Sequence, residues 1–155
     1  MSMDIEVFSD RRLTTTAEWQ RAIGVERFPL RLDADVKFES SRGFVPAVLG
    51  DSKTGFECFH DDAREAMASF GRHFDRPWRF ALGIRWVGSR VDELQAAWMA
   101  ATAYAAATDG IVFDCEESKA LKPQQARDAI HRIKRQIPRM EELVAEIKRK
   151  FPAKP

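Results

Sequence analysis

The chain has 155 residues, of which 45% are hydrophobic and 32% charged, so it can bury the core of one ordinary domain. Its 25 basic and 24 acidic side chains leave a formal net charge of +1, which gives no reason to expect wholesale binding to nucleic acid. No apolar run approaches the roughly 18–20 residues that a membrane helix needs, and the first residues lack the basic and apolar regions of a signal peptide. We therefore expect a single domain, residues 1–155, that is soluble, cytoplasmic and not associated with a membrane.

The charge is divided unevenly along the chain. Residues 1–118 carry 14 basic and 20 acidic side chains, a net charge of −6, whereas residues 119–155 carry 11 basic and 4 acidic ones, a net charge of +7. The domain thus consists of an acidic body, residues 1–118, and a basic C-terminal segment, residues 119–155. An acidic body suits a partner with a basic surface.

The two cysteines, Cys58 and Cys115, are predicted to be free thiols. Each lies in an apolar stretch, where an unpaired cysteine behaves as a small hydrophobic residue. Two cysteines are also too few for the disulfide framework of a small secreted protein. We expect no bond between them.

The first part of the chain alternates short strands with one helix. Thr15, followed three positions later by Glu18, has the form of a capping box, and Gly24 stands where a left-handed helix stop is expected. Gly, Asp and Ser in a four-residue turn favour a hairpin between the last two strands. The expected elements are a strand at residues 5–8, a helix at about 15–23, a strand at 30–32, and a hairpin of strands 44–49 and 54–59.

Two helices and two strands are expected in the middle of the chain. Asp61 or Asp62 can cap a short helix that ends at about Phe70 and is closed by Gly71. Residues 78–87 alternate between apolar and other side chains, as a strand would. A long helix follows, and after Asp109-Gly110 the apolar residues 111–113 form the returning strand of a strand–helix–strand unit.

The long helix is predicted to be the central buried helix. Ser89 and Asp92 can form its capping box. Eight alanines between residues 96 and 107 make it narrow on several faces, so it can approach a sheet closely. We expect Leu94, Trp98 and Ala101 to be buried against the sheet.

The C-terminal segment carries seven apolar residues in an a/d heptad seam of just over three heptads. Pro138 interrupts the pattern, so we expect a kink or two consecutive helices near residues 136–138. The seam can pack on the domain's own body, join a second copy in a homodimer, or present a basic helix to nucleic acid, although interrupting glutamates and a lack of aromatic residues count against the last. The seam residues are Ile130, Ile133, Ile137, Met140, Val144, Ile147 and Phe151.

The segment Cys58-Phe59-His60-Asp61-Asp62 contains the densest set of reactive side chains. In a strand, Cys58 and His60 project to the same face, and a thiol, an imidazole and carboxylates can form a metal site or a nucleophile–base pair. The simpler interpretation is structural, because Asp61 and Asp62 are also ordinary residues for starting a helix. No second cluster of ligands accompanies the segment, so we assign no metal site to it.

A second acidic cluster, Asp114, Glu116 and Glu117, follows the apolar strand at residues 111–113. It can be a solvated loop or a patch for a basic partner, and we take these three residues with Asp61 and Asp62 as the candidate partner-binding residues.

No glycine-rich phosphate loop, Gly-x-Ser-x-Gly elbow or His-Glu-x-x-His motif occurs. We accordingly assign no catalytic residue and no cofactor.

One stretch resembles a known group of proteins. It is a strand ending in Arg85-Trp86, an alanine-rich helix containing Glu93-Leu94 and Tyr104-Ala105, and the run from Asp109 to Asp114. This pattern over residues 85–114 resembles small, uncharacterised bacterial α/β proteins, some of which are immunity proteins that neutralise toxins of type VI secretion or contact-dependent competition. The resemblance implies a fold and a protein partner, and no functional residue is transferred from it.

The sequence therefore predicts an α+β domain: a mainly antiparallel sheet of about five or six strands, the alanine-rich helix packed on it, and a long C-terminal helical segment interrupted by proline. The function we expect first is protein binding without catalysis, as in an immunity protein that masks a toxin. The alternatives are a small-molecule-binding protein or enzyme that uses the Cys58/His60/Asp61 region, and a homodimeric structural module joined through the C-terminal helix.

Overall fold

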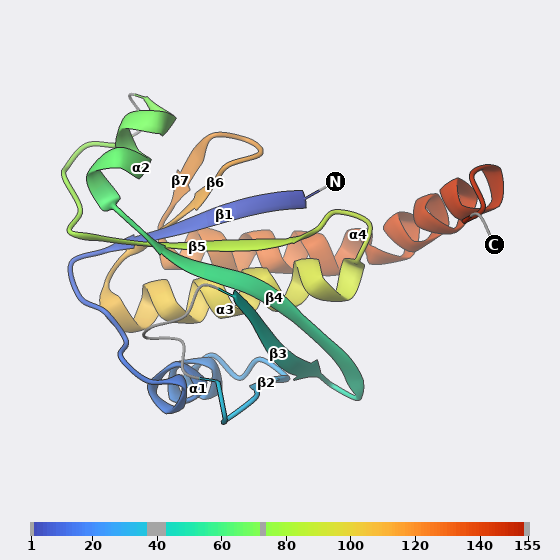
Figure 1. Cartoon of the computed structure of the whole chain (residues 1–155), viewed down its shortest axis with the longest axis horizontal. Coiled ribbons are helices and arrows are strands. Elements are labelled where there is room, and N and C mark those ends of the chain that lie inside the picture. The colour runs from blue at the N-terminus through green and yellow to red at the C-terminus, as the bar shows by residue number, and fades with distance from the viewer. Residues whose placement is uncertain (1, 37–42, 72–73, 154–155) are drawn as a thin grey trace.

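The computed structural model describes residues 2–36, 43–71 and 74–153, and the strands in these ranges form one seven-stranded sheet (Figure 1). The strand order is β2-β3-β4-β5-β1-β6-β7, and every neighbouring pair is antiparallel. The predicted α+β class is confirmed, with seven strands rather than five or six. In chain order the elements are β1 (Ser2–Ser9), α1 (Thr16–Val25), β2 (Leu30–Leu32), β3 (Gly43–Leu49), β4 (Ser52–Asp61), α2 (Ala63–Phe70), β5 (Phe80–Val87), α3 (Val91–Thr108), β6 (Ile111–Asp114), β7 (Lys119–Leu121) and α4 (Pro123–Lys150).

The centre of the sheet is β1, which lies between β5 and β6. Because both neighbours are antiparallel to β1, they run parallel to each other, and α3 connects them across one face of the sheet. This is the strand–helix–strand return that the sequence predicts. The hairpin is also confirmed, since β3 pairs with β4 from Gly43–Cys58 to Leu49–Ser52.

One face of the sheet holds the main hydrophobic core. There α3 is nearly enclosed, with Trp98 5% exposed and Ala101 fully buried, as predicted, whereas Leu94 is only half-buried. The Trp19 indole nitrogen of α1 donates a hydrogen bond to the carbonyl oxygen of Ala100 at 2.9 Å, which ties α1 to α3. The alanines of α3 leave room for this close approach. α4 packs on the same side, against α3, β6 and β7.

The opposite face is covered at one end by the short helix α2. Its N-terminus is capped by Asp62, whose carboxylate accepts from the backbone nitrogen of Glu65 at 2.9 Å, and Gly71 follows its last residue with φ +75°. A smaller core lies beneath it, in which the rings of Phe8, Phe70 and Phe113 stack edge-on or tilted. Toward β3 this face is more open, where Phe44 is 54% exposed.

Two predicted helix boundaries are wrong. Gly24 lies inside α1, and the left-handed residue after the helix is Arg27, with φ +60°. The capping box of Ser89 and Asp92 does not form, because α3 begins one residue later, with Arg90 at the N-cap and no side-chain cap hydrogen bond. The start of α1 is correct: the Thr15 hydroxyl accepts from the backbone nitrogen of Glu18 at 3.1 Å.

The C-terminal segment forms β7, which the sequence did not predict, and then a single helix. α4 runs through Pro138 without ending there, so of the two predicted alternatives, a kink or two consecutive helices, the second is wrong. Ile130 is 3% exposed, but beyond Pro138 the helix extends past the end of the sheet (Figure 1). The exposed fraction rises to 58% at Ile147 and 77% at Phe151.

Two further expectations concern the thiols and membranes. Cys58 and Cys115 are both free, as predicted. Within residues 2–36, 43–71 and 74–153, no helix combines the length and apolar character needed to cross a bilayer.

Candidate functional site

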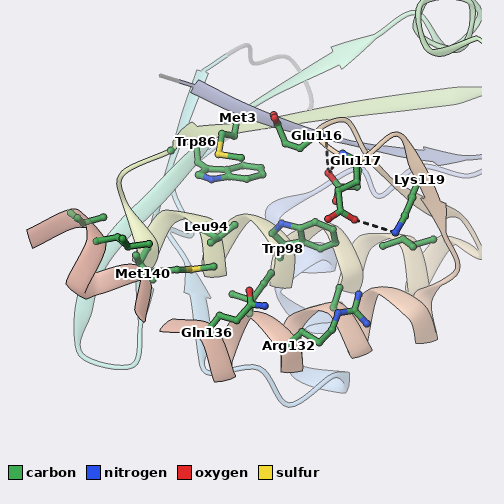
Figure 2. A pocket seen from close by; sticks show the side chains of 18 residues that line it. Met3, Trp86, Leu94, Trp98, Glu116, Glu117, Lys119, Arg132, Gln136 and Met140 are labelled. Carbon is green, nitrogen blue, oxygen red and sulfur yellow. Dashed lines mark hydrogen bonds and ion pairs between the residues drawn. The ribbon is translucent and has the colours of Figure 1, made fainter. Parts of the chain in front are cut away.

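A groove of about 460 Å³ lies between the sheet, α3 and the middle of α4 (Figure 2). Its apolar lining comes from five elements, one of which is β7 with Leu121, so the groove lies where the edge of the core opens to solvent. Met3 comes from β1, Trp86 from the core face of β5, Leu94 and Trp98 from one face of α3, and Ile133, Met140 and Val144 from the seam of α4.

The two tryptophans that line the groove are almost completely buried. Trp86 and Trp98 are 3% and 5% exposed, so both are anchored in the core and present only an edge to the opening. The Trp86 indole nitrogen is buried and has no hydrogen-bond partner among the described residues. A buried donor without a partner costs about 1–3 kcal/mol, so this indole lowers the stability of the core beside the groove.

One end of the groove has an acidic rim, formed by the turn between β6 and β7 (Figure 2). The Asp114 carboxylate accepts hydrogen bonds from the backbone nitrogens of Glu116 at 2.9 Å and Glu117 at 3.4 Å, which holds the turn in place. The Glu116 carboxylate accepts from the Asp4 backbone nitrogen at 3.4 Å, and the Glu117 carboxylate lies 3.4 Å from the Lys119 ammonium group. Both glutamates are otherwise exposed.

The position of this turn at the end of a strand affects the pKa of Asp114. Partial burial raises the pKa of Asp114 above its ordinary value, against the lowering effect of its two backbone hydrogen bonds and with a further rise from the neighbouring glutamates. Across the groove, α4 contributes Arg132 and Gln136 to the lining. The opening is therefore bordered by both signs of charge.

The five predicted partner-binding residues separate into two groups. Asp114, Glu116 and Glu117 come together at the groove, as a single acidic turn. Asp61 and Asp62 lie at the junction of β4 and α2, where Asp62 is used as a helix cap. The predicted set is thus not one continuous surface.

The Cys58/His60/Asp61 region does not converge on one point. Cys58 and His60 occupy the core-facing side of β4, opposite Ile84 and Leu82 of β5, while Asp61 points to the other face of the sheet. Cys58 is fully buried, and burial raises the pKa of its thiol to about 12. The protonated thiol is a poor nucleophile. In the part of the chain that the structure describes, no cluster of three or more His, Cys, Asp or Glu residues has the arrangement of a metal site.

Asp61 instead has a partner that the sequence did not suggest. Glu6 of β1 is only 4% exposed, and its pKa is raised to about 10 by burial first, then by a hydrogen bond with Asp61 and by the charges of Asp61 and Asp4. Nearby, the Arg85 guanidinium donates to the Asp4 carboxylate at 2.7 Å and lies over the Phe59 ring at 5.3 Å. The signal available in the sequence was a single glutamate inside the apolar run Ile5 to Phe8.

The groove itself was also missed, because no single segment of the sequence carries it.

Comparison of the chain with protein-family models, with curated proteins and with solved structures finds no match in any of the three. The site therefore has to be interpreted from its own geometry and chemistry.

Proposed function

We propose that this chain is a non-catalytic protein that binds a protein partner in the groove beside α4. The observation that carries the proposal is the make-up of the groove. Two tryptophans and two methionines line it, and charged side chains of the β6–β7 turn and α4 border it. An apolar centre rich in Trp and Met with a polar rim is the usual anatomy of a protein interface.

The chemistry of the lining indicates what such a partner presents. A large apolar side chain that enters the groove gains about 1.5–3 kcal/mol from burial, and aromatic walls are where a few anchors supply most binding energy. A basic residue beside that anchor would meet Glu116 and Glu117, which are exposed and lie at the groove's end. The net charge of −6 on residues 1–118 favours the same basic partner.

Within this class, we propose an immunity-type role, in which the partner is a toxin whose active surface is covered. The resemblance of residues 85–114 to small bacterial proteins that include immunity proteins supports this finer proposal. In the structure, this stretch forms the end of β5, α3 and β6, which contribute Trp86, Leu94 and Trp98 to the groove. A toxin captured by the groove would lose its activity in a one-to-one complex with this chain.

The binding proposal is tested with a library of random displayed peptides selected on the purified chain. We expect the selected peptides to share a large apolar residue next to lysine or arginine. The variant Glu116→Lys/Glu117→Lys should bind these peptides at least about tenfold more weakly than the wild type, as two lost charge contacts in a partly desolvated site predict.

The control carries the same charge change away from the groove. Asp51→Lys/Glu65→Lys alters two exposed carboxylates, in the β3–β4 turn and on α2. Peptide affinity for this control should stay within about twofold of the wild type, since neither side chain lines the groove and salt screens exposed charges. Equal loss in both variants, or peptides that share no apolar anchor, would contradict binding in the groove.

A further inference from the structure

We propose that the second half of α4 joins two copies of this chain in an antiparallel, two-fold symmetric helix pair. The segment concerned is residues 140–151. This proposal goes beyond partner binding in the groove, and it is tested with the purified chain alone.

The body leaves the end of this part of the seam uncovered. Met140 and Val144 are half-buried at the edge of the groove, whereas Ile147 and Phe151 are 58% and 77% exposed, and the neighbouring Leu143 is 50% exposed. Before Pro138, Ile130 is buried and Ile133 packs against the main core. Val144 borders hollows on both sides of α4, so the helix is held away from the body here. Figure 1 shows this segment extending beyond the sheet and α3. A row of exposed apolar side chains on a protruding helix is a surface that requires a covering partner.

The seam residues define the heptad positions of the segment. Val144 and Phe151 occupy position a, and Met140 and Ile147 occupy position d. In an antiparallel pair, a residues face d residues, so Val144 meets Ile147 of the second copy and Met140 meets Phe151. The two contacts have the same register, and each occurs twice about the two-fold axis. The segment is therefore complementary to itself in its apolar side chains.

The charges select the antiparallel orientation. Glu141 and Lys148 both occupy position e, and in an antiparallel pair the e positions of the two helices lie side by side. Each dimer thus gains two contacts between Glu141 of one copy and Lys148 of the other. In a parallel pair, e positions face g positions, and Glu141 and Lys148 would meet the uncharged Gln136 and Leu143. Only the antiparallel pair uses both charges.

Neither charge has another role within its own helix. The residues three and four positions from Glu141 and Lys148 are all apolar or proline, so substituting them breaks no i,i+4 ion pair. By contrast, Lys150 already pairs with Glu146 at 3.1 Å. Changes at 141 and 148 therefore break no ion pair within α4, and because both side chains also border the hollow that Arg90 and Asp92 line, the recovery of the dimer in the charge-swapped combinations identifies the contact between copies.

The contact is short, which sets the strength of the dimer. Twelve helical residues span about 18 Å, so the interface is smaller than that of a standard stable complex. We expect a reversible dimer with a dissociation constant roughly in the micromolar range, as for other small and transient protein interfaces.

The experiment is sedimentation equilibrium of the full chain from about 5 to 500 µM, a range chosen around that affinity. The wild-type mass should rise with concentration from 17.7 kDa toward twice that value. Glu141→Lys and Lys148→Glu should each weaken the dimer about tenfold, because two attractive pairs become repulsive. An equimolar mixture of the two variants, and the double variant Glu141→Lys/Lys148→Glu, should both recover the wild-type affinity to within about threefold, since opposite charges again face each other.

The matched control is Glu142→Lys, one residue along. It has the same charge change, but position f faces away from the partner helix, so the dimer should change by less than about twofold. A mass of one chain at every concentration overturns the proposal. So does a dimer that Glu141→Lys and Lys148→Glu leave unchanged, as a parallel pair or a dimer through another surface would behave. Met140 and Val144 belong to both surfaces, so charged residues separate the two proposals: Glu116→Lys/Glu117→Lys should lose peptide binding and keep the wild-type dimer.

Discussion

Glu6 shows how strongly the surroundings of a single residue can change its chemistry. Its carboxyl group lies on the central strand, 4% exposed, beside Asp61 and Asp4. Burial and two nearby carboxylates raise its pKa to about 10, so the group is neutral at pH 7 and can donate a hydrogen bond to Asp61. Its second oxygen has no hydrogen-bond partner among the described residues. The position tolerates a carboxylic acid but not a carboxylate.

This gives a pH dependence with a definite sign. The folded pKa of Glu6 is above the unfolded value, so between about pH 4.5 and 10 the folded chain holds a proton that the unfolded chain has lost. Stability therefore falls as the pH rises through this window. Glu6→Gln, whose amide can donate the same hydrogen bond, removes this titration. We expect urea unfolding to show that the wild type loses about 4 kcal/mol more than the variant between pH 6 and pH 9, since one proton is released on unfolding throughout this range.

The control is Asp51→Asn, an exposed carboxylate in the β3–β4 turn, which should leave the pH slope unchanged. If Glu6→Gln and the wild type lose stability in parallel over this range, Glu6 is ionised in the folded chain and the assignment of the proton is wrong.

At the scale of elements, the sequence predicts most where the signal is local. The hairpin of β3 and β4, the capping of α1 by Thr15 and the capping of α2 by Asp62 follow from neighbouring residues and are confirmed. β7 was missed because three residues with two exposed side chains carry no hydrophobic alternation. It forms through pairing with β6, a tertiary contact. The capping box predicted from Ser89 and Asp92 does not form for the same reason, because a tertiary feature, the turn after β5, sets where α3 begins.

For the candidate site too, the sequence predicts the part formed by neighbouring residues and not the part formed by distant ones. The acidic turn at residues 114–117 is contiguous, so it was predicted as a cluster. The groove combines β1, β5, β7, α3 and α4, and the pair of Glu6 and Asp61 joins two strands that are not even adjacent in the sheet. Such sets depend on the three-dimensional arrangement, which one sequence does not contain.

The two halves of α4 should respond differently to the same type of substitution. Ile130 is 3% exposed against α3, so Ile130→Ala should lower the free energy of unfolding by about 2–4 kcal/mol. Ile147 is 58% exposed, and Ile147→Ala should change the monomer by no more than about 0.5 kcal/mol. Chemical denaturation at low protein concentration measures both. A large cost at Ile147 in the monomer would mean that the body covers the second half of α4.

At the scale of the whole molecule, one sheet joins nearly all the parts. Its main core runs from α1 through α3 to α4, and the half-buried pair of Glu26 and Arg127, with nitrogen and oxygen atoms 2.6 Å apart, links the end of α1 to α4. With these contacts in one core, we expect the described elements to unfold together.

Cys58 reports on this cooperativity. It is fully buried in the main core, and burial raises the pKa of its thiol to about 12, so it should not react with a thiol reagent in the native chain. In a Cys115→Ser background, labelling of Cys58 should rise with urea at the same midpoint as the loss of helical circular dichroism. Labelling at clearly lower urea would show that β4 opens before the rest.

The central place of β1 has a consequence for the chain as it emerges from the ribosome. Its residues 2–9 are synthesised about 70 residues before the first of the two strands that flank them, residues 80–87, and about 100 residues before the second, residues 111–114. Until then both edges of an apolar strand remain without partners, which is the condition in which nascent chains associate wrongly or are held by chaperones. The middle of the sheet can close only after residue 114 has been translated. Folding of the sheet is thereby deferred until β6 has emerged, and with so many distant pairings it should take roughly milliseconds to seconds rather than microseconds.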